Sequence, residues 1–280
     1  MAKRLAVFSV LGRSVALMND WAESAGLEVA VLVTLHGPTS NPHQHSSTIA
    51  SVRRHTTVMV VPDVTACQAA LCASRVDLGL VVAFNRVPDC VASIPRHGTV
   101  NIHPALLPAY RGPNGYRALY EGEKRLGATL HRVTQEIDSG PILAQSSVPT
   151  PENVEPASAI AAIQSAIVSV LDEGVPRALA DEPGEPQDAS AASFAQKFSC
   201  EEAVVDLNLS KHLFQCRVTA LMLADVQPWV ILDERHPLRG VRPLPGVRSE
   251  GFGVVSLSAR RAIVAVNDGV LELELGEMHL

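Results

Sequence analysis

The stretch GTVNIHPALLPAYRG, residues 98–112, places two polar side chains where a short apolar strand ends. Side chains alternate along an extended strand, so Asn101 and His103 share one face while Val100 and Ile102 share the other. Taken alone, the pair fits an amide that caps the strand end and a histidine that is satisfied in the core. The pair also fits two functional groups aimed at a ligand, so the rest of the sequence has to decide between these interpretations.

Strand-like and helix-like segments alternate in the first half of the chain, a pattern that indicates a parallel sheet. The polar segment 36–45 is predicted to be a loop. The fold class is therefore α/β, with a doubly wound, mostly parallel, Rossmann-like sheet, and ligands are expected beyond the carboxyl ends of its strands. Apolar runs and helical spacing predict strands at residues 4–10, 27–35, 56–62, 76–84 and 98–103, and helices at 14–25 and 64–74.

The second half of the chain changes character after a predicted helix at 157–172. The stretch VPRALADEPGEPQDAS that follows carries three prolines and several acids, which is typical of a linker. Alternating apolar runs, joined by turn residues such as Asn267-Asp268-Gly269, then indicate β-structure. We predict a first domain at 1–175, a linker at 176–198 and a small β-rich C-terminal domain at 199–280.

Composition and charge restrict the class of protein. No apolar run approaches the roughly 20 residues that a membrane-spanning helix needs. The five cysteines form no CxxC pair, which argues against a disulfide framework or a thiolate metal site and predicts a cytoplasmic protein. The net charge is −6, and residues 199–280 hold eight Lys and Arg against eleven Asp and Glu, a balance that argues against a nucleic-acid partner and against a membrane surface.

Three motifs in a fixed order carry a resemblance to a known family. The runs VNIHPALLPAYRG, YEGEKRLGATLHRV and IDSGPILAQ resemble the formyltransferases that use 10-formyltetrahydrofolate, among them the glycinamide ribonucleotide, methionyl-tRNA, amino-sugar and hydroxyornithine enzymes. A weaker similarity at FAQKFSCEEAVVDL resembles the segment that leads into their C-terminal domain. The resemblance implies the formyltransferase fold, and it implies that Asn101, His103 and Asp138 are the catalytic residues.

The chemistry of formyl transfer explains why these three residue types are needed. When an amine attacks the formyl carbon, negative charge develops on the formyl oxygen, and an amide donor and a protonated imidazole stabilise that charge. Asn101 and His103 would supply both donors. Asp138 is expected to raise the pKa of His103 and to relay the proton of the amine.

The resemblance also implies which backbone holds the folate. Main-chain groups after the fourth strand and in the loop QEID would wrap the pterin ring, and they comprise Phe84, Asn85, Arg86, Val87, Gln135, Glu136 and Ile137. Arg86 is in addition a candidate partner for a carboxylate of the glutamate tail of the folate. His131 follows the Gly-x-Thr sequence of the family and is expected to support Asp138 or His103.

The acceptor site is less determined by sequence. The loop RGPNGY differs from the RGxxP pattern of the tRNA and sugar enzymes, so the identity of the acceptor does not transfer from the family. Candidate acceptor contacts are Arg13, Ser14, Tyr110, Arg111 and Asn114. The histidines at 36, 43 and 45 lack a carboxylate or cysteine at ligand spacing, so no metal site is predicted.

Several functions remain open at this point. The leading prediction is a formyltransferase that moves the formyl group of 10-formyltetrahydrofolate to an amine of a small-molecule acceptor. Methionyl-tRNA as the acceptor is the alternative, and a formyltetrahydrofolate hydrolase would use the same three residues with water as the acceptor. A folate-binding module without catalysis would not require the set of Asn101, His103 and Asp138.

Overall fold

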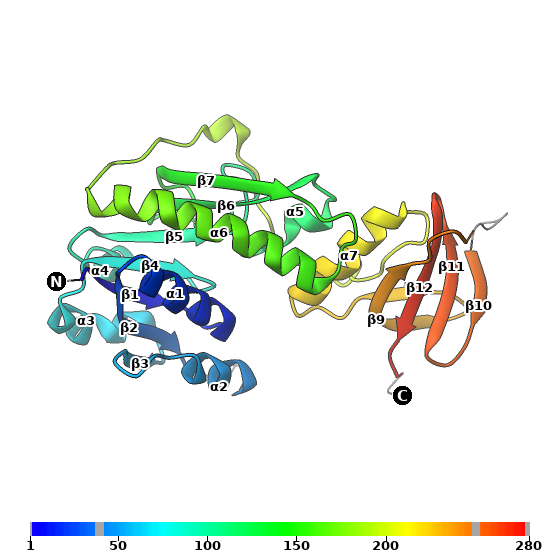
Figure 1. Cartoon of the computed structure of the whole chain (residues 1–280), viewed down its shortest axis with the longest axis horizontal. Coiled ribbons are helices and arrows are strands. Elements are labelled where there is room, and N and C mark those ends of the chain that lie inside the picture. Colours follow the sequence, from blue (N-terminus) through cyan, green and yellow to red (C-terminus); the bar gives the residue numbers. More distant parts are fainter. Residues whose placement is uncertain (1, 37–41, 248–252, 278–280) are drawn as a thin grey trace. The chain divides into compact units, whose positions relative to one another are not determined.

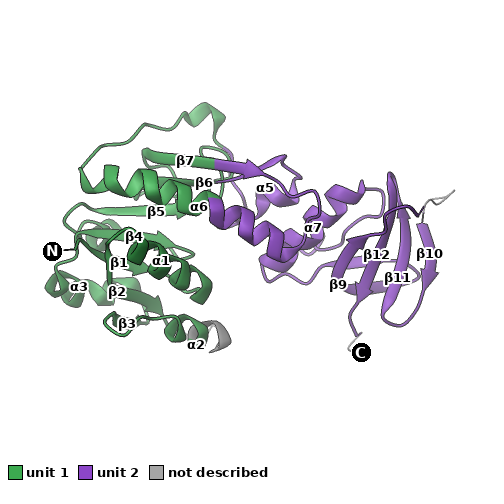
Figure 2. Ribbon diagram, in the orientation of Figure 1, with its two compact units in different colours: residues 1–111, 128–146, 166–192 green, residues 112–127, 147–165, 193–280 purple. Residues whose placement is uncertain are grey.

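The computed structural model describes residues 2–36, 42–247 and 253–277, with residues 42–45 described by their backbone alone. The chain divides into two compact units, which Figure 2 shows in separate colours. Unit 1 comprises residues 1–111, 128–146 and 166–192, and unit 2 comprises residues 112–127, 147–165 and 193–280. The predicted boundaries at 175 and 199 stay a prediction, because the units interleave along the chain.

A seven-stranded sheet runs through the N-terminal part of the chain (Figure 1). Its strands lie in the order β3-β2-β1-β4-β5-β6-β7, with parallel pairing from β3 to β5 and antiparallel pairing between β5 and β6. This order confirms the predicted doubly wound, mostly parallel α/β fold. The strands are β1 (Arg4–Phe8), β2 (Glu28–Leu35), β3 (Thr57–Val61), β4 (Leu78–Val82), β5 (Thr99–His103), β6 (Arg125–Arg132) and β7 (Ile142–Pro149).

The helices follow the predicted alternation, but the structure adds two short helices, Asp89–Ala92 and Arg117–Tyr120, and differs from the prediction in three longer segments. The segment predicted as a loop at 36–45 is wrong in part, because α2 begins at Pro42, and proline is favourable in the first turn of a helix. The second difference is α7, a helix of the C-terminal part that the sequence reading did not foresee. The helices are α1 (Gly12–Ser24), α2 (Pro42–Ala50), η1 (Val64–Cys67), α3 (Gln68–Ser74), α4 (Asp89–Ala92), α5 (Arg117–Tyr120), α6 (Pro156–Leu179), η2 (Ala189–Ala191) and α7 (Lys211–Leu223).

Helix α6 is longer than predicted and runs past Pro176 into the segment taken for a linker. Its last turns pack closely on the sheet, since a Cβ added at Gly174 would come within 2.5 Å of Leu130 and 3.1 Å of Ala144. Asp172 accepts a hydrogen bond from the Trp21 indole at 2.8 Å. By length and composition alone α6 could cross a membrane, but these contacts are those of a helix that covers a sheet.

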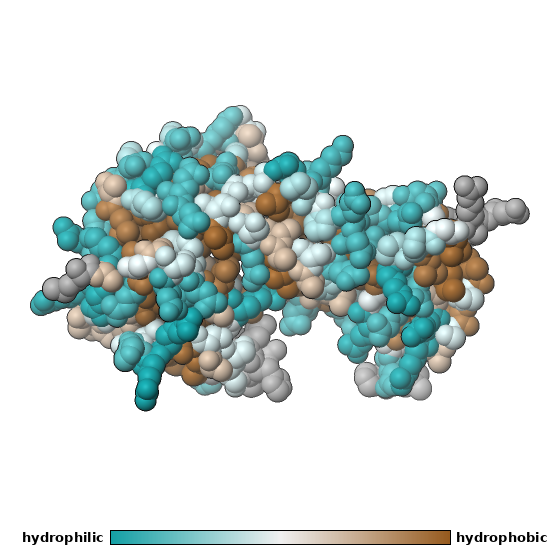
Figure 3. Space-filling view, viewed as in Figure 1, coloured by the Kyte–Doolittle hydropathy of each residue, from teal (hydrophilic) through white to brown (hydrophobic). Residues whose placement is uncertain are grey.

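The C-terminal part forms a second sheet of five strands in the order β10-β11-β12-β9-β8, and every described pair is antiparallel. This confirms the predicted β-rich C-terminal domain. The outer strand β10 exposes Val254, Val255 and Leu257, and Figure 3 shows apolar side chains gathered there. The strands are β8 (Trp229–Ile231), β9 (Arg235–Pro243), β10 (Gly253–Leu257), β11 (Arg261–Val266) and β12 (Gly269–Leu275).

Residues 112–127 belong to unit 2 because they form many contacts with its C-terminal part. Arg117 forms an ion pair with Glu202 and lies 4.6 Å over the ring of Phe198. Tyr120 donates a hydrogen bond to the carbonyl of Glu202 at 3.0 Å. These contacts explain why the segment after residue 111 belongs with the C-terminal sheet although the chain then returns to β6.

Candidate active site

The antiparallel pairing of β5 with β6 fixes the first part of the site. Asn101 pairs with His131 and His103 pairs with Thr129 in the register of the two strands. The imidazoles of His103 and His131 are almost fully buried, and Asn101 is half-buried. Two strands that follow one another in the chain, joined by residues 104–124, therefore present an amide and two imidazoles next to one another.

Asp138 completes the group from the loop between β6 and β7. Its Oδ1 accepts a hydrogen bond from Asn101 Nδ2 at 3.0 Å, and its Oδ2 lies 3.5 Å from His103 Nδ1. The Asp138 side chain is 12% exposed, so solvent still reaches this carboxylate, as it reaches the half-buried Asn101. We call Asn101, His103, His131 and Asp138 the polar cluster.

Hydrogen bonds define the proton positions of His131 and Asn101. His131 Nδ1 donates to the carbonyl of Arg132 at 2.9 Å, because a carbonyl can only accept. His131 Nε2 therefore accepts from Asn101 Nδ2 at 3.1 Å and lies 3.5 Å from Asp138 Oδ1. Both N–H bonds of the Asn101 amide thus point into the polar cluster. The predicted supporting position of His131 beside Asp138 agrees with this geometry, while its role stays a prediction.

His103 is held on both sides of its ring. Nε2 donates to the carbonyl of Tyr110 at 2.7 Å, and Nδ1 faces Asp138. Burial lowers the pKa of His103 below its ordinary value of 6.5 and outweighs the opposite effects of the Asp138 carboxylate and the Tyr110 carbonyl, while His131 adds to the lowering. The Asp138 carboxylate does act to raise the pKa of His103, as predicted, but the cost of burying an imidazolium is larger, so the net pKa is lowered.

The two predicted folate loops are joined by a hydrogen bond. Arg86 Nη2 donates to the carbonyl of Gln135 at 2.7 Å, so this guanidinium is used at least partly inside the protein. The backbone turns at Ala83, where φ is 47°, and Phe84 packs edge-on against Phe8 at 5.9 Å. Of the predicted residues, Asn85, Arg86, Gln135, Glu136 and Ile137 are exposed, Phe84 is half-buried and Val87 is buried.

The candidate acceptor contacts fall into separate places. Arg13 and Ser14 lie in the first turn of α1, directly after β1. Tyr110 has a left-handed backbone with φ of 60° and gives its carbonyl to His103. Arg111 donates two hydrogen bonds to Gln187. Within unit 2, the Asn114 amide donates to the carbonyl of Gln196 and accepts from the backbone N–H of Tyr116. The predicted acceptor roles of all five residues stay predictions.

Gln187 is a residue of the site that the sequence reading missed. It lies in the predicted linker, where a Pro- and acid-rich composition gave no reason to select a single glutamine. Its side chain donates to the carbonyls of Asp138 and Gly140, both at 2.8 Å. Gly140 was also not predicted as a site residue. Only glycine fits at this position, because an added Cβ would lie 1.8 Å from the carbonyl oxygen of Arg132.

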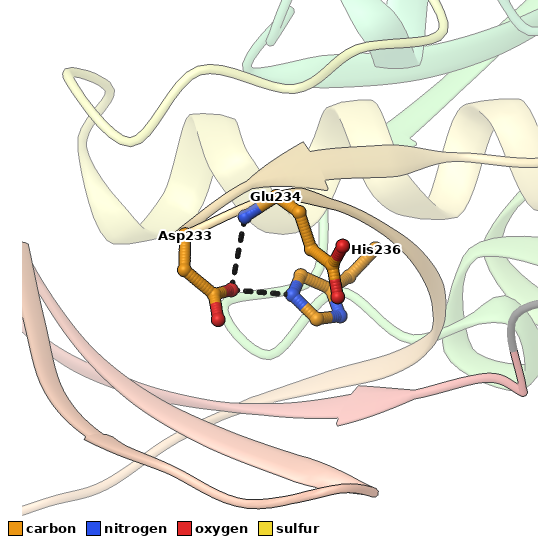
Figure 4. A group of neighbouring side chains, drawn as sticks. All are labelled: Asp233, Glu234 and His236. Atoms are coloured by element: carbon orange, nitrogen blue, oxygen red, sulfur yellow. Dashed lines mark hydrogen bonds and ion pairs between the residues drawn. The ribbon is translucent and has the colours of Figure 1, made fainter.

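A group with metal-binding atoms lies in the hairpin between β8 and β9. Among the described residues, Asp233, Glu234 and His236 bring ligand atoms within 4.8 Å of one another, and Figure 4 shows the three side chains. Asp233 Oδ1 accepts from His236 Nε2 at 2.7 Å and from the backbone N–H of Glu234 at 2.9 Å, so turn hydrogen bonds account for its position. The prediction of no metal site at the three histidines involves His43 and His45, whose side chains lie outside the described residues.

A cavity of about 380 Å³ lies within unit 2. None of its lining residues is a predicted site residue. Backbone and side chains from the start of α6, from α7 and from the C-terminal sheet enclose it, among them Glu155, Thr219, Arg239, Arg242, Arg261 and Glu272.

The sequence is similar to that of known enzymes over much of its length. A family profile described as formyl transferase matches residues 40–173. The methionyl-tRNA formyltransferase of Thermotoga neapolitana is 32% identical over 151 residues, which cover 51% of this chain and 47% of that protein. The enzyme of the same name from Pseudomonas entomophila is 31% identical over 222 residues, which cover 74% of this chain and 67% of that protein.

The chain belongs to the formyl transferase family. It spans about half the length of the first curated relatives that it matches, with 47% and 43% of those proteins covered. The motifs that carry the polar cluster lie within residues 40–173, which is the part matched by the family profile. The predicted family is therefore confirmed.

Two solved structures share the fold over nearly the whole chain. A crystal structure of HypX from Aquifex aeolicus in complex with tetrahydrofolic acid has a TM-score of 0.69 and 17% identity, and covers 98% of this chain and 44% of that one. WlaRD, a sugar 3N-formyl transferase crystallised in the presence of dTDP and 5-N-formyl-tetrahydrofolate, has a TM-score of 0.64 and 13% identity, with both chains fully covered. At these identities the likeness confirms the fold alone.

The prediction of a small-molecule acceptor without nucleic acid is contradicted by the curated relatives, which are named methionyl-tRNA formyltransferases and so act on a tRNA. The prediction rested on the negative net charge of the chain and of its C-terminal part. Net charge averages over the whole surface, whereas contact with a polyanion depends on where the basic side chains lie. Composition was therefore the wrong quantity from which to exclude a tRNA.

Proposed function

We propose that this protein transfers the formyl group of 10-formyltetrahydrofolate to the amino group of methionyl-tRNA. The observation that carries the proposal is the polar cluster, in which Asn101, His103 and Asp138 meet within 3.0 to 3.5 Å. The names of the curated relatives support the tRNA acceptor, and the folates in the structures of HypX and WlaRD support the donor. A cytoplasmic location accompanies this proposal.

The His103–Asp138 pair can take up one more proton, at His103 Nδ1. His103 carries its hydrogen on Nε2, where it is bonded to Tyr110, so the unprotonated Nδ1 faces the Asp138 carboxylate. The amine must lose a proton when it attacks the formyl carbon. In the proposed reaction Asp138 relays this proton to His103 Nδ1, and the carboxylate then stabilises the imidazolium. The same proton would pass on to the folate nitrogen as its bond to the formyl carbon breaks.

Asn101 supplies the donor for the developing oxyanion. Both of its N–H bonds are engaged in the resting arrangement, one on a carboxylate and one on the neutral nitrogen of His131. A hydrogen bond to a charged acceptor is roughly twice as strong as one to a neutral acceptor. The bond to His131 is therefore the one exchanged for the formyl oxygen, while the bond to Asp138 keeps the amide oriented.

The surface beside Asp138 suits a flat heteroaromatic ring. Ile137, the residue before Asp138, is 51% exposed and offers an apolar surface on which such a ring could lie. The bond from Arg86 to the Gln135 carbonyl holds the loop after β4 against the loop after β6. When bound, the folate would supply the formyl group, and the exposed backbone of residues 84–87 and 135–137 would orient it.

The proposal is tested by mixing the protein with 10-formyltetrahydrofolate and measuring tetrahydrofolate release with methionyl-tRNA, uncharged tRNA, free methionine or no acceptor. Release that requires methionyl-tRNA, together with formyl-methionine on the tRNA, is the expected result. Release without any acceptor would identify a hydrolase instead and contradict the proposal. Asp20→Asn is a suitable control for Asp138→Asn, because Asp20 is an exposed carboxylate of α1 that pairs with Arg53.

A further inference from the structure

We propose that Gln187 and Arg111 act together as a positioning pair that sets both ring nitrogens of His103. The inference rests on the proposed function, because it concerns the same polar cluster. It starts from two residues with left-handed backbone, Tyr110 with φ of 60° and Asp138 with φ of 52°. These are the residues that contact His103, Tyr110 through Nε2 and Asp138 through Nδ1.

Left-handed backbone at residues other than glycine is costly and persists only where the surroundings hold it. Asp138 is held through Gln187, whose two N–H bonds go to the carbonyls of Asp138 and Gly140 at 2.8 Å each. The carbonyl oxygen of Gln187 accepts from Arg111 Nε at 3.0 Å and from Nη2 at 2.7 Å. The amide of Gln187 therefore has both donor hydrogens and its acceptor oxygen in use.

Arg111 connects this arrangement to the other side of His103. It follows Tyr110 directly in the chain, so its side chain fixes the peptide that carries the Tyr110 carbonyl. One guanidinium and one amide thus link the loop after β5 to the loop after β6. Without Gln187, the carbonyls of Asp138 and Gly140 and the Arg111 guanidinium lose these hydrogen bonds. Without Arg111, the Gln187 carbonyl oxygen loses both of its donors.

The segment that carries Gln187 is itself fixed by backbone pairing. Ile142 and Glu185 exchange two N–H to carbonyl hydrogen bonds, at 2.7 and 2.8 Å, so residues before Gln187 lie along the start of β7. Gly184 makes this approach possible, since its φ is 80° and an added Cβ would lie 2.8 Å from the Ile142 carbonyl oxygen. The segment predicted as a linker is therefore held against β7 and places Gln187 in the site.

The test compares Gln187→Ala, Arg111→Ala and the double variant, with Gln164→Ala as control, because the described contacts of the half-buried Gln164 on α6 include no part of the site. A displacement of a catalytic group by about 1 Å costs on the order of a hundredfold in rate. We expect kcat to fall on the order of ten- to a hundredfold in each single variant, with KM for 10-formyltetrahydrofolate changed less than about threefold. The double variant should lose no more than the worse single one, since paired residues act as one unit.

Amide hydrogen exchange on the protein alone tests the inference without any substrate. Amides of residues 134–141 should exchange faster in Gln187→Ala and Arg111→Ala than in the wild type or Gln164→Ala. Arg111→Lys, which keeps the charge but loses the forked pair of donors, should give a smaller change in the same direction and serves if an alanine variant does not fold. A wild type without formyl transfer would overturn the proposed function while leaving this measurement valid.

Two outcomes would overturn the inference. The first is unchanged exchange of residues 134–141 in Gln187→Ala. The second is additive losses of kcat in the double variant, which would mean that Gln187 and Arg111 act separately.

Discussion

The polar cluster and the charged strip formed by Arg242, Arg261 and Glu272 on the C-terminal sheet use similar side chains in different surroundings. In the strip, Glu272 pairs with Arg242 and lies 3.5 Å from Arg261, and both arginines are more than 60% exposed. In the cluster, two imidazoles are buried and one carboxylate is 12% exposed. Glu272 is itself only 14% exposed, but both of its arginine partners are solvated and the hydrogen bond from Arg242 lowers its pKa, whereas in the cluster burial lowers the pKa of His103.

The difference shows why only one of these groups is suited to chemistry. The carboxylate of Glu272 has a lowered pKa because of its hydrogen bond to Arg242, so it stays ionised. The pKa of His103 is lowered by burial, which favours the neutral imidazole that the proposed reaction needs as a base. Four experiments test the difference between the polar cluster and the charged strip.

Asp138→Asn should have the largest effect. The change removes the carboxylate that stabilises a protonated His103, while the amide keeps nearly the same shape. Loss of one such preorganised electrostatic group costs about 3 to 4 kcal/mol of transition-state stabilisation, or on the order of 10² to 10³ in kcat. Single-turnover formation of formyl-methionyl-tRNA measures the loss, and a rate within threefold of the wild type would remove Asp138 from the reaction.

Gly140→Ala should strongly destabilise unit 1. The added methyl would overlap the Arg132 carbonyl oxygen at 1.8 Å, so the Asp138 loop or β6 has to move. We expect Tm to fall by roughly 10 °C or more, because strain of this kind costs several kcal/mol. Gly26→Ala is the control: φ is 69° but the methyl meets nothing within 4 Å, so only about 1 kcal/mol is lost. Equal Tm values for the two variants would contradict the described packing.

The pH dependence of stability should reveal the burial of His103. Since its folded pKa is lowered, the unfolded chain binds a proton that the folded chain does not, in the range below about pH 6.5. The free energy of unfolding should therefore decrease as the pH falls below 6.5. Urea unfolding of the wild type and of His103→Gln between pH 5 and 7.5 measures this, and the slope should be smaller in the variant. Parallel curves would show that the folded pKa is not lowered.

Glu272→Gln in the charged strip should have the smallest effect. The partners of Glu272 are solvated, and exposed ion pairs contribute little to stability and less at high salt. We expect a change in Tm of no more than about 3 °C, decreasing when salt is raised from about 0.05 to 0.5 M. A larger, salt-independent change would show that the strip resembles the polar cluster more than its exposure suggests.

The sequence predicted much of the seven-stranded sheet and of the polar cluster. Strand alternation is local, so the side-by-side placement of Asn101 and His103 followed from residues 98–103 alone. The order of motifs pointed to Asp138 through family resemblance. Helix α7 was missed because its apolar residues surround the helix and give no clear one-sided pattern. The end of helix α6 was placed too early, because composition does not show that Pro176 can lie inside a helix covered by tertiary contacts.

The sequence by itself determined the parallel α/β sheet, the family and the residues of the polar cluster, because periodicity and motifs are written in local order. The lowered pKa of His103 depends on the tertiary structure, since burial depends on all the surrounding elements and outweighs the nearby carboxylate. The contact of Gln187 with Asp138 depends on it too, since Gln187 lies 49 residues from Asp138 in the chain and is brought there by the pairing of Glu185 with Ile142. Contacts of this kind depend on how distant segments pack, and no local pattern encodes them.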